Sequence, residues 1–372
     1  MGFPNERAPA DSEVGLYQSG EDPLPLHPED LSQTMEKIRV AVIGAGVVGL
    51  STAVCVAESI PDCSVTVIAE KFSPQTTSDV AAGVLSPHFS PETPIHRQKR
   101  WFEDTFAHVY SLVQTAEAPN IGVQILSGWE IFKEPPVEHI PFWSDSVLAF
   151  RVMNDAELMR FPEAIFGWMY TTLLCDCTHY LPWLEKRLKN AGGRLRSAKI
   201  RDFWELDGTF DIIVNCSGIG ARALTGDMKL YPVRGQIQKV HAPWLKHFIC
   251  LNGRTTYIFP GITSVILGGT WQKDDWRMSA DPNDSKAIFE DCCLYEPSLK
   301  LSRRLFEGVG LRPARAVLRL EKEKLERDGR QMRLVHNYGH GKSGVSFHWG
   351  TAKEAAQLVQ EYVTKMRCQP KL

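Results

Sequence analysis

Near the start of the chain lies the stretch that decides the fold: Arg39-Val40-Ala41-Val42-Ile43-Gly44-Ala45-Gly46-Val47-Val48-Gly49. Its first five residues form a short apolar run that ends at glycine, which is typical of a buried parallel strand. Gly44 permits a tight turn, Gly46 lets the backbone approach a ligand, and Gly49 allows a following helix to pack closely. We therefore predict a strand over residues 39–43, a glycine turn, and a helix over residues 50–58.

A second strand is predicted over residues 64–70, which completes a β-α-β unit of right-handed connection. A diphosphate would lie on the free N–H groups and the positive dipole end of the helix. Glu70 ends the second strand about twenty residues after Gly49, where a carboxylate can accept hydrogen bonds from ribose hydroxyls. The unit indicates dinucleotide binding and does not say which dinucleotide.

The rest of the chain predicts an α/β fold: a doubly wound, Rossmann-like dinucleotide domain with an inserted, largely antiparallel α+β domain. Helices are predicted over residues 180–190 and 351–366, the second after a glycine-dense loop at 338–350, and a buried strand over 211–216. Alternating aromatic patterns at 256–259 and 265–269 suggest the antiparallel part. The predicted divisions are a disordered leader (1–36), the dinucleotide domain (37–90, 178–220 and 306–372) and the inserted domain (91–177 and 221–305).

Composition excludes several classes of protein. The 372 residues include 42 Lys and Arg against 44 Asp and Glu, which gives a net charge of −2. The chain therefore lacks the excess of positive charge that is typical of proteins that bind nucleic acid or an anionic membrane. Nine cysteines without a C-x-x-C spacing favour reduced thiols inside a cell. His336 and His340 have metal-ligand spacing, but neighbouring glycines break any helix, so we expect no metal.

Five blocks, in order along the chain, resemble those of the D-amino-acid oxidase family. They are Thr76-Thr77-Ser78-Asp79-Val80-Ala81-Ala82-Gly83, Arg234-Gly235-Gln236, Gly268-Gly269-Thr270, Gly310-Leu311-Arg312-Pro313 and Asn337-Tyr338-Gly339-His340-Gly341. The resemblance covers roughly residues 37–365 and is closest to the D-aspartate oxidase branch. It implies an FAD domain joined to an antiparallel substrate domain.

The resemblance also implies which residues contact the FAD. Most of them lie in the glycine turn, after the second strand, in the Thr76–Gly83 block and in the loop from Gly339 to Ser346; Val84, Ile200 and Ser217 lie outside these segments. The residues are Gly44, Ala45, Gly46, Val47, Val48, Gly49, Glu70, Lys71, Thr77, Ser78, Ala82, Gly83, Val84, Ile200, Ser217, Gly341, Lys342, Ser343, Gly344, Val345 and Ser346.

For the substrate, the resemblance implies that Arg312 grips the α-carboxylate and that the Tyr257 hydroxyl bonds to the same group. A planar guanidinium binds a carboxylate bidentately, which a lysine cannot do. The Lys342 carbonyl would receive the amino group, and we expect the Lys342 side chain to point to solvent. The implied chemistry is hydride transfer from Cα to flavin N5, giving a 2-oxo acid, ammonia and hydrogen peroxide, with no residue acting as general acid or base.

Three features favour acidic D-amino acids, D-aspartate or D-glutamate. Arg234 matches an arginine that the aspartate branch uses for the second carboxylate, although it can equally be a strand-end ion pair. His88 resembles that branch, and only the seven residues 250–256 form the lid before Tyr257. One feature disfavours acidic substrates: Trp271 occupies the position at which this branch has an arginine for the second carboxylate. Loss of that charge-assisted hydrogen bond would weaken substrate binding by about 1.5–3 kcal/mol.

Two alternatives stay open from the sequence. The same reaction on neutral D-amino acids would follow from Trp271, and a flavin-containing binding protein without turnover is disfavoured by the intact Arg312 and Tyr257. The chain ends Pro370-Lys371-Leu372, which resembles a peroxisomal targeting tripeptide. An enzyme that releases peroxide belongs beside catalase, so we expect a peroxisomal location, with the import receptor as a partner besides O2 and the amino acid.

Overall fold

The computed structural model describes residues 36–251 and 256–368, and within these ranges the chain from Lys37 onward forms one compact unit. The predicted leader, but for Glu36, lies outside the described residues. So do residues 252–255 of the predicted short lid and the C-terminal tripeptide.

The described ranges contain strands and helices with the following bounds. The strands are β1 (Ile38–Ile43), β2 (Cys63–Ala69), β3 (Val123–Phe132), β4 (Leu148–Val152), β5 (Phe166–Cys175), β6 (Arg194–Ser197), β7 (Ile212–Asn215), β8 (Tyr231–His241), β9 (Phe248–Leu251), β10 (Thr256–Pro260), β11 (Val265–Gly268), β12 (Gln272–Lys273), β13 (Arg303–Arg327) and β14 (Arg330–His340). The α-helices are α1 (Val47–Ser59), α2 (Thr77–Val80), α3 (Ile95–Val113), α4 (Ala118–Ile121), α5 (Asp155–Leu158), α6 (Cys177–Asn190), α7 (Ala221–Thr225), α8 (Pro282–Tyr295) and α9 (Gly344–Cys368).

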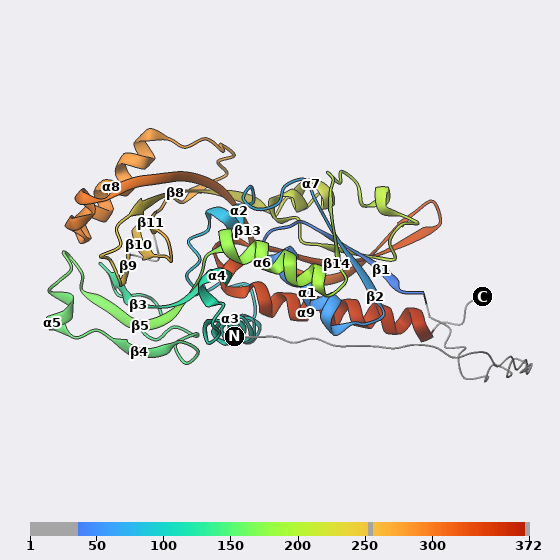
Figure 1. Ribbon diagram of the computed structural model, residues 1–372, viewed down its shortest axis with the longest axis horizontal. Helices are drawn as coiled ribbons and strands as arrows, with labels where there is room; N and C mark the ends of the chain where they lie inside the picture. Colours follow the sequence, from blue (N-terminus) through green and yellow to red (C-terminus); the bar gives the residue numbers. More distant parts are fainter. Residues whose placement is uncertain (1–35, 252–255, 369–372) are drawn as a thin grey trace, which may run out of the picture. The chain divides into compact units, whose positions relative to one another are not determined.

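One sheet runs through the whole unit in the order β4-β5-β3-β9-β10-β11-β8-β13-β14-β7-β1-β2-β6, and β12 pairs with β8. The strands from β14 to β6 are parallel to one another, and most of the other pairs are antiparallel. The long strand β13 joins the two parts, because its first half pairs with β8 and its second half with β14 (Figure 1). It changes partner at Ala314, which is in register with residues of both neighbours.

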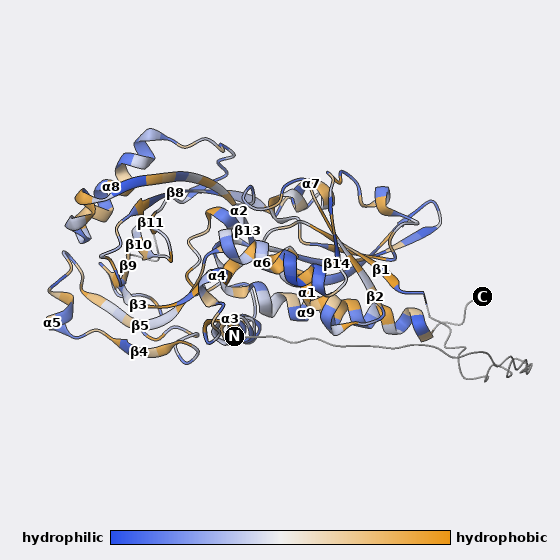
Figure 2. Cartoon of the chain, in the orientation of Figure 1, coloured by the Kyte–Doolittle hydropathy of each residue, from blue (hydrophilic) through white to orange (hydrophobic). Residues whose placement is uncertain are grey.

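The apolar run of β1 is explained by burial on both faces. Val40 and Val42 pack on the side of α1, α6 and α9, whereas Ala41 and Ile43 belong to a second cluster with Phe203 on the opposite face. Alternate residues of a strand point to opposite faces, so a strand covered on both sides must be apolar throughout. Figure 2 shows β1 and β2 coloured as hydrophobic along most of their length.

The prediction of a glycine-dense loop over residues 338–350 was wrong at both ends, because residues 338–340 belong to β14 and only Gly341–Ser343 separate this strand from helix α9. Helix α9 begins at Gly344, seven residues earlier than predicted, and its first turns are buried. Gly350 lies inside this helix. The position requires glycine because a Cβ there would come within 2.3 Å of the Trp101 carbonyl oxygen on α3. The glycine therefore allows two helices to approach closely instead of marking a loop.

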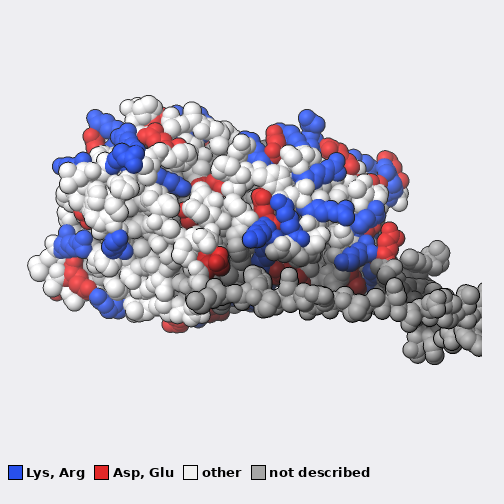
Figure 3. Space-filling model, in the orientation of Figure 1, with Lys and Arg blue, Asp and Glu red and all other residues white. Residues whose placement is uncertain are grey.

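The inserted segments supply the antiparallel part of the sheet, as predicted, with one parallel pair between β3 and β9. The assignment of these segments to a separate domain stays a prediction, because the sheet is continuous across the proposed boundary. On the face shown in Figure 3, basic and acidic side chains are interspersed. No helix in the described ranges is long and apolar enough to cross a membrane.

Candidate active site

A cavity of about 980 Å³ opens at the carboxyl ends of β1, β2 and β7 and continues to β8, β10 and β13. This is the edge at which open parallel sheets bind their ligands. The volume lies at the upper end for small-molecule sites, so it can hold a dinucleotide together with a small substrate.

The glycine turn forms one end of the cavity. Gly44 has φ +110°, and a Cβ there would lie 2.4 Å from the Cys216 carbonyl oxygen that follows β7. A Cβ at Gly49 would lie 2.0 Å from the Gly44 oxygen, so both positions require glycine. Helix α1 begins at Val47 with Gly46 as N-cap and no acidic residue in its first turn, which suits the diphosphate of FAD.

Glu70 lies directly after β2 and lines the same end of the cavity. Lys199 forms a 3.0 Å ion pair with it, and the hydrogen bond from Lys199 holds the pKa of Glu70 below its usual range. The Glu70 carboxylate is therefore ionised at neutral pH and able to accept hydrogen bonds from ribose hydroxyls.

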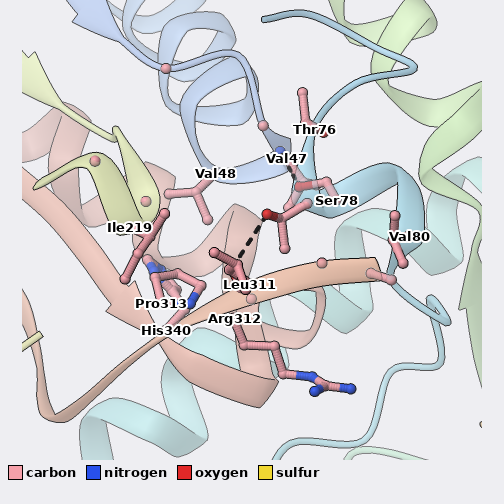
Figure 4. Close-up of a pocket in the computed structure, with 18 of the residues that line it drawn as sticks. Val47, Val48, Thr76, Ser78, Val80, Ile219, Leu311, Arg312, Pro313 and His340 are labelled. Carbon is pink, nitrogen blue, oxygen red and sulfur yellow. Dashed lines mark hydrogen bonds between the residues drawn. The ribbon is translucent and has the colours of Figure 1, made fainter. Parts of the chain in front are cut away.

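Side-chain hydrogen bonds fix helix α2 against the start of α1 on one side and against β13 on the other. Ser78 Oγ accepts the Val47 N–H at 3.0 Å, and Thr77 Oγ1 donates to the Leu311 carbonyl at 3.4 Å (Figure 4). Asp79, which the sequence reasoning missed, closes a capping box with Thr76. The Thr-x-x-Asp spacing at the start of a helix was a signal for this role.

Nearly all residues predicted to contact FAD line the cavity. The exceptions are Ser343 and Ser346, which are not part of the cavity wall. Ser343 Oγ accepts the His88 N–H at 3.1 Å, and Ser346 Oγ accepts the Ser86 N–H at 3.1 Å. Both serines hold the segment after Val84 in place, so the structure gives them a positioning role.

Arg312 projects from β13 at the other end of the cavity, on the side away from Val47 and Ser78 (Figure 4). Its Nη1 donates to the Thr270 carbonyl at 3.1 Å, and no carboxylate of the described residues forms an ion pair with it. Gly235 makes room for the guanidinium, because a Cβ there would lie 2.1 Å from Arg312 Nη1. Glycine inside a strand often marks such a close approach.

Tyr257 comes from β10 and is buried with its ring stacked on Phe259 at 4.6 Å. Gly268 and Gly269 make room for it: Cβ atoms there would lie 2.3 and 2.8 Å from the Tyr257 hydroxyl oxygen. The glycines of two blocks that resemble the oxidase family, 234–236 and 268–270, thus leave space for the side chains of Arg312 and Tyr257. The sequence reasoning missed this role.

Arg234 does not line the cavity, and its contact with a substrate carboxylate stays a prediction. The side chain is fully buried, and all five of its N–H donors have acceptors. These acceptors are Gln236, Gln272, Asp284 and the carbonyls of Arg277 and Ser279. These contacts fit the alternative role of a structural ion pair: Arg234 bonds to both ends of the segment from Gln272 to Asp284, which includes Met278 of the cavity wall.

The Lys342 side chain does not simply extend into solvent as expected. Its Nζ lies 4.0 Å from the centroid of the Trp271 ring, and the Arg312 guanidinium carbon lies 5.7 Å from the same centroid. Trp271 is 45% exposed, so this cluster borders the solvent. His88 lines the cavity nearby, and also a smaller cavity of about 150 Å³ walled by Glu130 and aromatic rings.

The cavity wall has few groups that could act as acid or base. Among the described residues that line it, Glu70 is the only carboxylate. His340 is buried, which lowers its pKa to about 3 and keeps its ring neutral. No cluster of His, Cys, Asp or Glu suited to a metal ion occurs in the described part of the chain. His336 and His340 have separate partners, Glu323 and Thr351.

The arrangement has counterparts among known proteins. The family model described as "FAD dependent oxidoreductase" matches residues 39–358. Human D-aspartate oxidase is 55% identical over 333 residues, which cover 90% of this chain and 98% of the relative. A D-amino acid oxidase of Dugesia ryukyuensis is 36% identical and covers 89% of this chain and 100% of the relative.

The solved structure of glycine oxidase from Geobacillus kaustophilus has a TM-score of 0.70 at 20% identity, covering 87% of this chain and 95% of that one, which shows a shared fold. The family expected from the sequence blocks is therefore confirmed, as is its cofactor, which the glycine turn, Glu70 and the cavity volume fit. The chain belongs to the family of FAD-dependent oxidoreductases that includes the D-amino-acid and D-aspartate oxidases.

Proposed function

We propose that this protein oxidises acidic D-amino acids, D-aspartate foremost and D-glutamate as well, to the 2-oxo acid, ammonia and hydrogen peroxide. The observation that carries the proposal is one cavity with the glycine turn at one end and the Arg312 guanidinium and Tyr257 at the other. The acidic side chain is supported by the 55% identity to human D-aspartate oxidase.

Arg312 and Tyr257 bind and orient the substrate. The guanidinium takes the α-carboxylate bidentately, while the Thr270 carbonyl holds the side chain in place. The Tyr257 hydroxyl donates a hydrogen bond to the same carboxylate, and the Lys342 carbonyl accepts one from the amino group. Three fixed contacts select one enantiomer, because only one hand places Cα–H toward the cavity interior.

The glycine turn, Glu70 and the Thr77–Ser78 segment would hold FAD, which would supply two-electron oxidation: a hydride would leave Cα, a proton would leave the substrate amino group, and O2 would take up both to become hydrogen peroxide. The remaining imino acid takes up water and releases ammonia. No wall residue is assigned as general base, because the amine lone pair itself forms the imine. The protein's share is to orient the substrate between Arg312, Tyr257 and the Lys342 carbonyl.

A peroxide-release assay with D-aspartate, D-glutamate, D-alanine and D-proline tests the proposal, with L-aspartate as the stereochemical control. We expect D-aspartate to be the preferred substrate. Arg312→Lys should keep its flavin absorbance yet lose most activity on every substrate, since a point charge cannot reproduce the bidentate grip. Arg304→Lys, an exposed change on the same strand, is the matched control. Peroxide release from none of the four would refute the proposal.

A preference for neutral D-amino acids is the second candidate. Trp271 favours it, because an indole on the cavity wall offers apolar surface to a small neutral side chain. The ratio of kcat/KM for D-aspartate to that for D-alanine separates the two candidates: a value below one would establish the neutral preference.

The proposal includes a peroxisomal location, supported by the chemistry of the product, since hydrogen peroxide calls for catalase nearby. An import receptor would then be a partner. A fluorescent protein fused ahead of the chain, with and without the Pro370-Lys371-Leu372 tripeptide, tests this; an unchanged cytosolic distribution of both fusions would contradict it.

A further inference from the structure

The chain between β11 and β12 departs from regular strand pairing at the substrate end of the cavity. Strand β11 ends at Gly268, which is in register with Ile237 of β8, and β12 begins at Gln272, which is in register with Arg234 of β8. Between these two pairs one side has three residues and β8 has two. An extra residue on one strand of an antiparallel pair is a β-bulge, and bulges beside ligand sites redirect the groups that they carry.

The hydroxyl of Thr270, in the middle of this bulge (residues 269–271), replaces a partner that regular pairing would supply. Thr270 Oγ1 accepts the Gln236 N–H at 2.8 Å and donates to the Arg234 carbonyl at 3.5 Å. A backbone N–H carries a single hydrogen, so the hydroxyl stands in for the strand carbonyl that would otherwise face Gln236. Gln236 is fully buried, and a buried N–H without an acceptor is costly.

The bulge also carries the two groups that hold the Arg312 guanidinium. The Thr270 carbonyl accepts a hydrogen bond from Arg312 Nη1 at 3.1 Å, and the Trp271 ring centroid lies 5.7 Å from the guanidinium carbon. The hydroxyl of Thr270 is therefore bonded to β8 while its carbonyl is bonded to a side chain of β13. Because both groups belong to one residue, fixing the hydroxyl also fixes the direction of the carbonyl.

We infer that Thr270 is a positioning residue of the substrate site: its hydroxyl holds the bulge on β8 and thereby aims Arg312 at the substrate α-carboxylate. The inference rests on the proposed function, in which Arg312 binds that carboxylate, and it names the residue that sets the direction of the guanidinium. Gly235 leaves room for the guanidinium, whereas the bond from Arg312 to Thr270 orients it.

Loss of the hydroxyl would change where the Thr270 carbonyl points. The buried Gln236 N–H would lack its acceptor, which favours a rearrangement in which a backbone carbonyl of residues 269–271 turns toward β8. A carbonyl turned in this way no longer faces Arg312. Bidentate binding requires the guanidinium and the carboxylate to meet in a fixed geometry, so a rotation of Arg312 weakens the grip even when its charge stays in the cavity.

Thr270→Val tests the inference, because valine keeps the β-branched shape and removes the hydroxyl. We expect kcat/KM to fall roughly 5- to 140-fold, by the same factor for D-aspartate and D-alanine, which share the α-carboxylate. Thr270→Ser should restore most of the activity, since serine keeps the hydroxyl. The affinity of the flavin-loaded enzyme for succinate, measured by titration of the flavin absorbance, should fall in Thr270→Val and recover in Thr270→Ser.

Thr171→Val is the matched control, since the Thr171 hydroxyl also bonds across neighbouring strands, 2.7 Å from Ser127 Oγ, and Thr171 is not part of the cavity wall. It should leave both measurements unchanged. Thr270→Ala gives the same comparison with Thr270→Ser should the valine variant fail to retain flavin.

Three results would overturn the inference: wild-type kcat/KM in the variant without the hydroxyl, equal impairment of Thr270→Ser, or a loss confined to D-aspartate. Wild-type enzyme that releases peroxide from neither substrate would instead refute the proposed function. The succinate titration would still decide whether the Thr270 hydroxyl controls carboxylate binding.

Discussion

Gly235→Ala should disable the enzyme by moving one side chain. The new Cβ would lie 2.1 Å from Arg312 Nη1 and 2.4 Å from both the guanidinium carbon and Nη2. Carbon and nitrogen atoms cannot approach so closely, and the guanidinium is the mobile partner. We expect Arg312 to leave the position from which it meets the α-carboxylate, while β8 and β13 keep their pairing.

The size of the effect follows from the contact that is lost. A hydrogen-bonded pair with a charged partner contributes about 1.5–3 kcal/mol, which is roughly a 10- to 140-fold fall in kcat/KM. The fall should be the same for D-aspartate and D-alanine, because both carry the α-carboxylate. Steady-state peroxide release with both substrates measures it, and flavin absorbance checks that the cofactor is retained.

A double-mutant cycle decides whether the loss acts through Arg312. In an Arg312→Ala background there is no guanidinium to displace, so Gly235→Ala should cost almost nothing further. Gly220→Ala is the control, because its Cβ would meet no atom closer than 3.7 Å. Near-normal kcat/KM for Gly235→Ala, or a full additional loss in the Arg312→Ala background, would refute the reasoning.

Three further outcomes follow from the structure. Gly46→Val should abolish bound flavin absorbance, because its side chain would press on Ser78 Oγ, 3.1 Å from a Cβ, and on the space before α1; full flavin occupancy would contradict this. Arg234→Met should expose the 272–284 segment to limited proteolysis and lower the melting temperature, because the acceptors of its five hydrogen bonds lose their donors; an unchanged cleavage pattern would count against the anchoring role. Stability should fall below pH 6.5, where the unfolded chain protonates histidines that burial keeps neutral in the folded one, by up to about 1.4 kcal/mol per pH unit for each. Urea unfolding at pH 7.5, 6 and 5 measures this, and a flat profile would argue against neutral rings at His108, His340 and His348.

The sequence by itself determined the parallel core and the cofactor end of the cavity. Strand β1, the glycine turn and α1 are contiguous, and glycine conformations and apolar runs are local properties. The predicted strand over residues 64–70 and the strand over 211–216 lie within one residue of β2 and β7 at each end. Sequence patterns sufficed here because neighbours in the chain decide these features.

Only the tertiary structure decided what the substrate end contains. Arg234 and Arg312 look alike in sequence, since both are strand arginines within two residues of a glycine. Four of the five acceptors of Arg234 lie 38–50 positions further along the chain, whereas Arg312 faces the cavity because Gly235, on the neighbouring strand, leaves room for it. The approach of Lys342 to Trp271 likewise joins segments about 70 residues apart. Which arginine has all its donors engaged and which faces the cavity depends on partners that no local pattern identifies.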